Sequence, residues 1–228
     1  ARQPLIAVLG AGSWGTALAI LLARHQNRVR MWGNLPEPVR QLNEDRENRE
    51  FLPGVAFPDA LSVTNDLAAA IEGVDEVLVV VPSHAFSSVM GQLRDINPEL
   101  ASLSWATKGL EPGSRQLLHQ VAADYFPGAD IGLISGPTFA MEVARGLPTA
   151  ITVASSQRAH ADRLAEYLKG ETFRAYTSPD MVGVQVGGAA KNVMAIAAGI
   201  ADGLGFGANA RAALITRGLA EITRLGLE

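Results

Sequence analysis

Two of the three lysines in this 228-residue chain stand where a compact, titratable ammonium could do chemistry. Lys191 is surrounded by glycine, alanine, valine and methionine, and it is the only formally charged residue between Asp180 and Asp202. Burial among small apolar residues disfavours a charged lysine and lowers its pKa toward the range useful for proton transfer. Lys191 is therefore a candidate general acid or base. A lysine that extends to solvent or pairs with a carboxylate is the alternative interpretation.

The other two lysines have different settings. Lys108 follows a predicted strand at residues 101–106 and precedes Gly109. Open α/β sheets bind ligands at the carboxyl ends of parallel strands, so Lys108 is either a ligand contact or an ordinary loop lysine. Lys169 falls in the last turn of a predicted helix, where a cation suits the helix dipole, and we expect it to be structural.

A glycine-rich turn near the start of the chain predicts a dinucleotide site. Residues 10–15 read Gly-Ala-Gly-Ser-Trp-Gly, between a predicted strand at 4–9 and a predicted helix at 13–25. Glycines at positions 10, 12 and 15 permit a tight turn and let backbone N–H groups approach a pyrophosphate at the helix N-terminus. A turn that merely packs the helix on the strand is the alternative.

Asn34 occupies the position at which such folds usually select their cofactor. An acid there holds the ribose hydroxyls of NAD, and a basic group accommodates the 2′-phosphate of NADP. Asn34 carries neither charge, although Arg30 or Arg40 could reach the site. We expect NADP or NAD as cofactor, and the missing carboxylate favours NADP.

The elements that must position these residues alternate between strand and helix. Together they predict an α/β fold: a Rossmann-like, mostly parallel sheet with helices on both faces. From residue 180 onward we expect only helices, at about 180–202 and 208–226, which form the start of an all-α C-terminal domain. The predicted domains are residues 1–179 and 180–228. Since two helices make a poor domain, we expect a longer natural protein. The remaining strands are predicted at 28–33, 61–63, 75–81, 131–134, 149–154 and 172–176.

Composition argues against several other functions. A formal net charge of −4 provides no basic surface for nucleic acid. Without cysteine, and with four scattered histidines, the chain supports no metal site. Residues 181–201 are apolar over a membrane-spanning length, but the central Lys191 favours a helix buried in protein over a membrane segment. We also expect no signal peptide and a cytoplasmic location.

Motifs along the whole chain resemble those of bacterial NAD(P)-dependent glycerol-3-phosphate dehydrogenases. The resemblance implies reversible hydride transfer between dihydroxyacetone phosphate with NAD(P)H and sn-glycerol 3-phosphate, for glycerophospholipid synthesis. It further implies a phosphorylated triose or glycerol substrate and is compatible with a homodimer. The motifs are GAGSWGTALA at 10–19, Asn48 with Leu52-Pro53-Gly54, VPSHAF at 81–86, ATKGLE at 106–111, SGPTFAMEVARGLPTA at 135–150, GAAKNVMAIAAGIADGLGFG at 188–207 and ARAALITRGLAEITRLG at 210–226.

The same resemblance assigns roles to individual residues. Lys191 matches the catalytic proton acceptor, which also contacts substrate, and Lys108 matches a residue that contacts both cofactor and substrate. The family's Gly-Asp-Leu and Ser-Arg-Asn phosphate-binding segments would follow Glu228, so we expect residues 1–228 alone to bind dinucleotide but turn over poorly. Further substrate contacts are Gly136 and Thr138, and the cofactor contacts are Gly10, Gly12, Ser13, Trp14, Gly15, Asn34 and Ala140.

Two other functions stay open at this stage. A β-hydroxyacid dehydrogenase could share the Rossmann-plus-helical plan and a helix lysine, but it would need a group that binds a carboxylate. A non-catalytic module that senses NAD(P)H is the second alternative. Lys191 argues against the sensor, since a sensor needs no lysine in an apolar helix.

Overall fold

Eight strands form a single sheet in the computed structural model, which describes residues 2–226. The strands match the predicted ones closely, and the apolar run of residues 77–79 in one of them is fully buried. The strand bounds are β1 (Leu5–Leu9), β2 (Arg28–Trp32), β3 (Leu61–Thr64), β4 (Glu76–Val79), β5 (Ser102–Trp105), β6 (Asp130–Ser135), β7 (Thr149–Ala154) and β8 (Phe173–Ser178).

The strand order is β3-β2-β1-β4-β5-β6-β7-β8, and the strands from β3 to β6 are parallel. β7 runs antiparallel to β6, and β8 runs parallel to β7, so these last two strands run opposite to the other six. This arrangement confirms the predicted Rossmann-like, mostly parallel sheet. After β1 the next two strands, β2 and β3, are added on one side of β1, whereas β4 and the later strands are added on its other side. The strand order therefore reverses between β1 and β4, and such sheets bind dinucleotides at this switch point.

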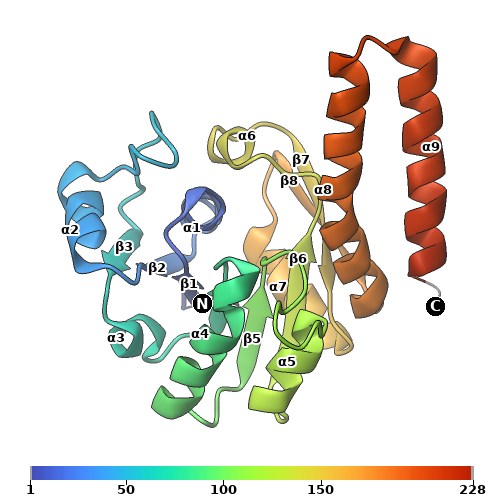
Figure 1. Ribbon diagram of the computed structural model, residues 1–228. Coiled ribbons are helices and arrows are strands. Elements are labelled where there is room, and N and C mark those ends of the chain that lie inside the picture. Colours follow the sequence, from blue (N-terminus) through green and yellow to red (C-terminus); the bar gives the residue numbers. More distant parts are fainter. Residues whose placement is uncertain (1, 227–228) are drawn as a thin grey trace.

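Helices cover both faces of the sheet (Figure 1). The helix bounds are α1 (Ser13–Arg24), α2 (Pro36–Asp45), α3 (Leu67–Ile71), α4 (Ser83–Ile96), α5 (Leu118–Tyr125), α6 (Ala140–Ala144), α7 (Arg158–Leu168), α8 (Met181–Gly203) and α9 (Gly207–Leu225). Alternate residues of β1 divide between the two layers: Ile6 and Val8 pack into a core with α1 and α7, whereas Ala7 and Leu9 pack into a core with α4 and α5.

The last two helices form a hairpin that stands beside the sheet (Figure 1). Asp180 begins α8, where its carboxylate accepts the N–H of Gly183 at 2.8 Å. Gly218 of α9 leaves room for the flexible end of the Met194 side chain of α8, which packs against it.

Helix α8 is less covered than its sequence predicted. The expectation of a helix buried in protein is wrong for its second half, where Val193, Ile196 and Ile200 are exposed. The apolar residues are spread around the helix, and the contacts with the sheet and with α9 cover only part of that circumference. By length and composition alone, α8 is the one helix within residues 2–226 that could cross a membrane.

Candidate active site

Each of the three glycines in the loop after β1 is required, or tolerated, for a different physical reason. Gly10 has φ +127°, and a Cβ there would lie 2.6 Å from the carbonyl oxygen of Val80 at the end of β4. A Cβ at Gly15 would overlap the carbonyl oxygen of Gly10, so only glycine lets α1 pack this close to the turn. Gly12 differs, because a Cβ there would meet nothing within 4 Å.

This open space at Gly12 fits a pyrophosphate. Gly12 precedes the first residue of α1, Ser13, and no side chain caps the helix. Uncapped N–H groups at a helix N-terminus attract anions, and a glycine lets the phosphate oxygens approach the backbone. The loop therefore has the chemistry and the open space that a pyrophosphate needs, and the cofactor contacts expected at Gly10, Gly12, Ser13 and Gly15 stay a prediction.

Asn48 holds this loop from behind, a role that its sequence position alone did not reveal. Its side chain is buried, and its amide nitrogen donates to the carbonyl of Ala11 at 3.0 Å and to the hydroxyl of Thr16 at 2.9 Å. The amide oxygen accepts the N–H of Phe51 at 3.1 Å. Thus the segment after α2 fixes the carbonyl of Ala11.

Asn34 follows a glycine that packs against the glycine loop, and its place near the cofactor ribose stays a prediction. The preceding Gly33 packs against Ala11, since a Cβ at Gly33 would lie 3.3 Å from the Cβ of Ala11. Asn34 itself is exposed. The two arginines with the reach to bind a 2′-phosphate are engaged elsewhere: Arg30 donates to the carbonyls of Ala69 and Glu72, and Arg40 pairs with acids of its own helix.

Lys108 and Lys191 meet at a single backbone oxygen. The ammonium of Lys108 donates to the carbonyl of Gly136 at 3.2 Å, and the ammonium of Lys191 donates to the same oxygen at 3.2 Å. The two residues are 83 positions apart in sequence and come from the loop after β5 and from α8. The structure therefore brings together the two lysines that the sequence selected, at the carboxyl-terminal edge of the sheet.

The spacing of strands and helices explains this convergence. β5 pairs with β6 in register, Trp105 opposite Leu133, so Lys108 and Gly136 follow the ends of neighbouring strands. On α8, Gly188 approaches β6 so closely that a Cβ there would lie 2.7 Å from the hydroxyl oxygen of Ser135. This contact sets Lys191, one turn further along α8, against the Gly136 carbonyl.

The neighbouring ammonium groups alter the titration of Lys108. Partial burial is the main cause that lowers the pKa of Lys108 to about 8, and hydrogen bonding and charge repulsion from Lys191 act in the same direction. Burial disfavours a charged amine, and so does a second positive charge. Lys108 is thus able to change protonation state near neutral pH.

The other residues predicted to contact substrate or cofactor lie on nearby elements, and most of them make no specific side-chain contact within residues 2–226 that defines a role. Gly136 contributes its carbonyl, and Thr138 follows two residues later in the loop that leads to α6. Ala140 begins α6 and, like Trp14 of α1, packs against the core on that face. Lys169, in contrast, lies at the end of α7 and pairs with Glu166 at 3.6 Å, as expected for a structural lysine.

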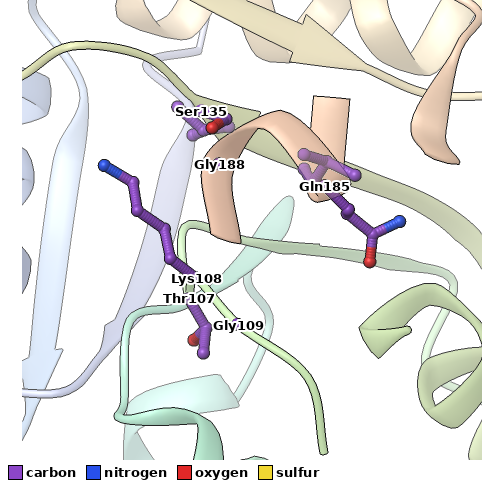
Figure 2. Close-up of a pocket in the computed structure, with 8 residues that line it drawn as sticks. Thr107, Lys108, Gly109, Ser135, Gln185 and Gly188 are labelled. Carbon is purple, nitrogen blue, oxygen red and sulfur yellow. The ribbon is translucent and has the colours of Figure 1, made fainter. Parts of the chain in front are cut away.

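The buried side-chain amide of Gln185 lies next to the two lysines' site, and its role was not predicted from the sequence. Gln185, on the first turns of α8, lines a small cavity together with Lys108, Gly109 and Gly188. Figure 2 shows the Gln185 side chain pointing away from Lys108. Its amide reaches His119 at the start of α5, with 2.8 Å between Gln185 Nε2 and His119 Nδ1. A glutamine in an apolar helix turn is the only sequence clue to this contact.

An apolar groove of about 900 Å³ lies apart from these residues, between α8 and α9. Its lining is apolar except for Arg217 and Glu221. Polar groups that could orient a reaction do not converge there. Within residues 2–226 no group of three or more histidine, aspartate or glutamate side chains is arranged to hold a metal ion.

The fold and the glycine loop define a Rossmann-type dinucleotide-binding protein with two lysines at the carboxyl-terminal edge of its sheet. Two family models match the chain: the N-terminal part of NAD-dependent glycerol-3-phosphate dehydrogenase over residues 5–161, and the C-terminal part over residues 180–228. The chain belongs to the NAD-dependent glycerol-3-phosphate dehydrogenase family.

Individual relatives agree with this assignment. A glycerol-3-phosphate dehydrogenase [NAD(P)+] of Thioalkalivibrio sulfidiphilus is 58% identical over 228 residues, which cover 98% of this chain and 68% of the relative. One from Yersinia pestis is 55% identical, over 97% of this chain and 66% of the relative. The chain thus spans about two-thirds of the length of these curated relatives.

Solved structures show the same fold. The glycerol-3-phosphate dehydrogenase of Coxiella burnetii superposes with a TM-score of 0.92 at 46% identity, over 98% of this chain and 68% of that one. The yeast enzyme superposes with a TM-score of 0.85 at 28% identity, over 99% of this chain and 70% of that one.

Proposed function

We propose that this protein is an NAD(P)-dependent sn-glycerol-3-phosphate dehydrogenase. It reduces dihydroxyacetone phosphate to sn-glycerol 3-phosphate, reversibly, and the product serves glycerophospholipid synthesis. The observation that carries the proposal is the meeting of Lys108 and Lys191 at the Gly136 carbonyl, on the sheet edge that also bears the glycine loop. The names of the relatives support the same activity.

The glycine loop and its neighbours would hold the cofactor. Backbone N–H groups at Gly12 and Ser13 would bind the pyrophosphate, and Asn34 would lie near the adenosine ribose. When bound, NAD(P)H would supply the hydride, and NAD(P)+ would accept it in the reverse direction. Because Asn34 brings no carboxylate against a 2′-phosphate, we propose that NADP is accepted as well as NAD.

The two lysines would handle the proton and the charge. As C2 of the ketone gains a hydride, its oxygen develops negative charge, and the Lys191 ammonium donates the proton that completes the alcohol. In the oxidative direction the neutral amine of Lys191 takes the C2 hydroxyl proton. Lys108, fixed beside it, would stabilise the developing alkoxide electrostatically.

Other aspects of the protein follow from this assignment. We propose that Gly136 and Thr138 contact the substrate, that Trp14 and Ala140 contact the cofactor, and that the protein works in the cytoplasm without a membrane segment. A homodimer is the oligomer to test first, by light scattering. The boundary between the dinucleotide-binding part and the helical part would fall at residues 179–180, before the Asp180 cap of α8.

Steady-state kinetics with the whole natural protein test the proposed activity. NADH and NADPH oxidation should depend on dihydroxyacetone phosphate, with little oxidation when β-keto acids replace it. Oxidation with a β-keto acid instead would favour a β-hydroxyacid dehydrogenase. Cofactor binding without turnover of either substrate would favour a non-catalytic NAD(P)H-binding module.

A further inference from the structure

The Lys108 loop is pinned at its base by its own backbone. Leu110 and Leu117 form an antiparallel bridge, and the N–H of Glu111 donates to the carbonyl of Gln116 at 3.0 Å. Lys108 lies two residues before this closure and His119 lies two residues after it. A contact to His119 therefore restrains one side of the Leu110–Leu117 bridge, and Lys108 lies just before the other side.

Gln185 provides that contact from α8. Its amide oxygen accepts the backbone N–H of His119 at 3.2 Å, and its amide nitrogen lies 2.8 Å from the Nδ1 atom of the same histidine. The nitrogen also donates to the carbonyl of Met181 at 2.9 Å, which fixes the side chain on its own helix. With 6% of its surface exposed, Gln185 has both of its polar atoms engaged.

The chemistry of this contact requires an uncharged histidine. An amide N–H donates to a ring nitrogen only when that nitrogen carries no proton. Burial lowers the pKa of His119, which favours the neutral ring that this contact needs. The Gln185–His119 contact is thus a neutral, two-point hydrogen-bonded clamp between α8 and the start of α5.

We propose that Gln185 and His119 are positioning residues that set the separation of the Lys108 and Lys191 ammonium groups. Lys191 lies six residues after Gln185 on the same helix, about 9 Å along its axis. Lys108 lies two residues before the Leu110–Leu117 bridge, and His119 lies two residues after it. The inference rests on the proposed function for its catalytic consequence, but the separation of the two lysines is measurable without turnover.

The direct test is the titration of Lys108 in the whole natural protein. Reductive methylation with ¹³C-formaldehyde labels the lysines, and carbon–proton NMR follows each methyl resonance with pH. Lys108→Arg identifies the Lys108 resonance. Gln185→Leu removes the contact that ties the segment after the Leu110–Leu117 bridge to α8, so we expect Lys108 to be held less closely beside Lys191 and its midpoint to rise from about 8 toward the ordinary value of about 10.4.

A matched control separates positioning from simple destabilisation. Asn27 is another buried amide that ties two elements together, donating to the carbonyls of Leu22 and Tyr167, but it lies at the other end of α1. Asn27→Leu should lose comparable stability and leave the Lys108 titration unchanged. If Gln185→Leu does not fold, Gln185→Asn withdraws the amide by one methylene and serves in its place.

Kinetics and a double-mutant cycle complete the test. Gln185→Leu should lower kcat roughly 10- to 100-fold with little change in the KM for NADH, since reacting groups misplaced by about 1 Å lose rate on that scale. His119→Ala should do the same, and the double variant should be no worse than either single one. Additive losses, or a Lys108 midpoint that stays at its wild-type value in both Gln185 variants, would overturn the proposal.

The two failures are distinguishable. If the wild-type protein does not reduce dihydroxyacetone phosphate, the proposed function is wrong, while a shifted Lys108 titration in Gln185→Leu would still establish the clamp. If the wild-type protein turns over normally and the titration is unmoved, only the clamp is wrong.

Discussion

Lysine and arginine have separate uses in this molecule. Sixteen arginines supply most of the positive charge, yet the two cations at the Gly136 carbonyl are both lysines. A guanidinium keeps its proton in proteins, whereas an ammonium beside another positive charge can release one. Two lysines that share one oxygen are an unfavourable arrangement in the resting protein, and a developing alkoxide between them would relieve it.

The lowered pKa of Lys108 predicts selective chemical labelling. At pH 8 a lysine with a pKa of about 8 is roughly half neutral, whereas an ordinary lysine is less than about 1% neutral. A short exposure to an amine-reactive reagent at pH 8, followed by peptide mass spectrometry, should therefore modify Lys108 early. Lys191→Met removes one cause of the lowered pKa, so labelling of Lys108 should become slower while burial still favours the neutral amine.

Lys169→Met is the matched control for that experiment. Lys169 lies at the end of α7, paired with Glu166 and remote from the site, so its removal should leave Lys108 labelling as it is in the wild type. Equal labelling of Lys108 in wild type and Lys191→Met would show that the two ammonium groups do not interact.

Among the elements, the turn from β1 into α1 combines two requirements that glycine meets for different reasons. Gly15 is needed for packing, because a side chain there would overlap the Gly10 carbonyl. Gly12 is surrounded by open space and is needed only if a ligand approaches the backbone. The two positions therefore separate stability from cofactor binding.

Alanine at each position should give opposite results. Gly15→Ala should unfold at a clearly lower temperature, because the turn must shift to admit the methyl group. Gly12→Ala should keep the wild-type melting temperature and weaken NADH binding by about tenfold or more, equal to about 1.4 kcal/mol, because the methyl group would occupy the pyrophosphate space. Fluorescence titration and calorimetry measure the two effects. Normal NADH affinity in a folded Gly12→Ala protein would contradict this assignment of the loop.

Most of the fold was predictable because local and global patterns agree. The strand of residues 76–79 is buried on both faces, and the run of four aliphatic residues at 78–81 is typical of a central strand in a covered parallel sheet. The turn at residues 10–15 combined glycine spacing with a strand and a helix, so its structure was predicted correctly, while its cofactor contacts stay a prediction. The half-exposed state of α8 was not predictable, since apolar periodicity does not say which neighbours cover a helix.

The candidate site was predictable only in part. Lys108 and Lys191 stood out as rare residue types in special settings. Their common partner did not, because a carbonyl oxygen belongs to every residue and only the pairing of β5 with β6 brings that of Gly136 into place. The contacts of Gln185 and Asn48 were not predicted for a similar reason: each amide bonds to backbone or side-chain groups 32 or more residues away.

At the scale of the whole molecule, the carboxyl-terminal and amino-terminal ends of the strands carry different kinds of residues. The carboxyl-terminal edge bears the glycine loop and the two lysines. Toward the opposite edge a buried polar cluster links β4, β5 and α7: Glu76 Oε2 lies 3.1 Å from His160 Nε2, which lies 3.2 Å from the hydroxyl of Ser104. Glu76 and His160 are almost fully buried, so this cluster contributes to stability and has no access to substrate.

Removing Glu76 should therefore affect folding and spare the chemistry. Glu76→Leu leaves the buried His160 and also Ser102 without their acidic hydrogen-bond partner, and an unsatisfied buried polar group costs about 1–3 kcal/mol. Chemical denaturation should show that loss. At a temperature where the variant is folded, the KM for dihydroxyacetone phosphate and the NADH affinity should match those of the wild type. A selective rise in KM would instead connect this cluster to the site.

Lys191 is the residue on which the proposed chemistry depends most directly. Single-turnover measurements on Lys191→Ala in the whole natural protein should show hydride transfer to dihydroxyacetone phosphate slowed by about 10²- to 10⁴-fold, the usual worth of a positioned acid or base. NADH should bind with wild-type affinity, because the glycine loop is unchanged. Hydride transfer within a few-fold of the wild-type rate would contradict the assignment of Lys191 as the residue that exchanges the proton.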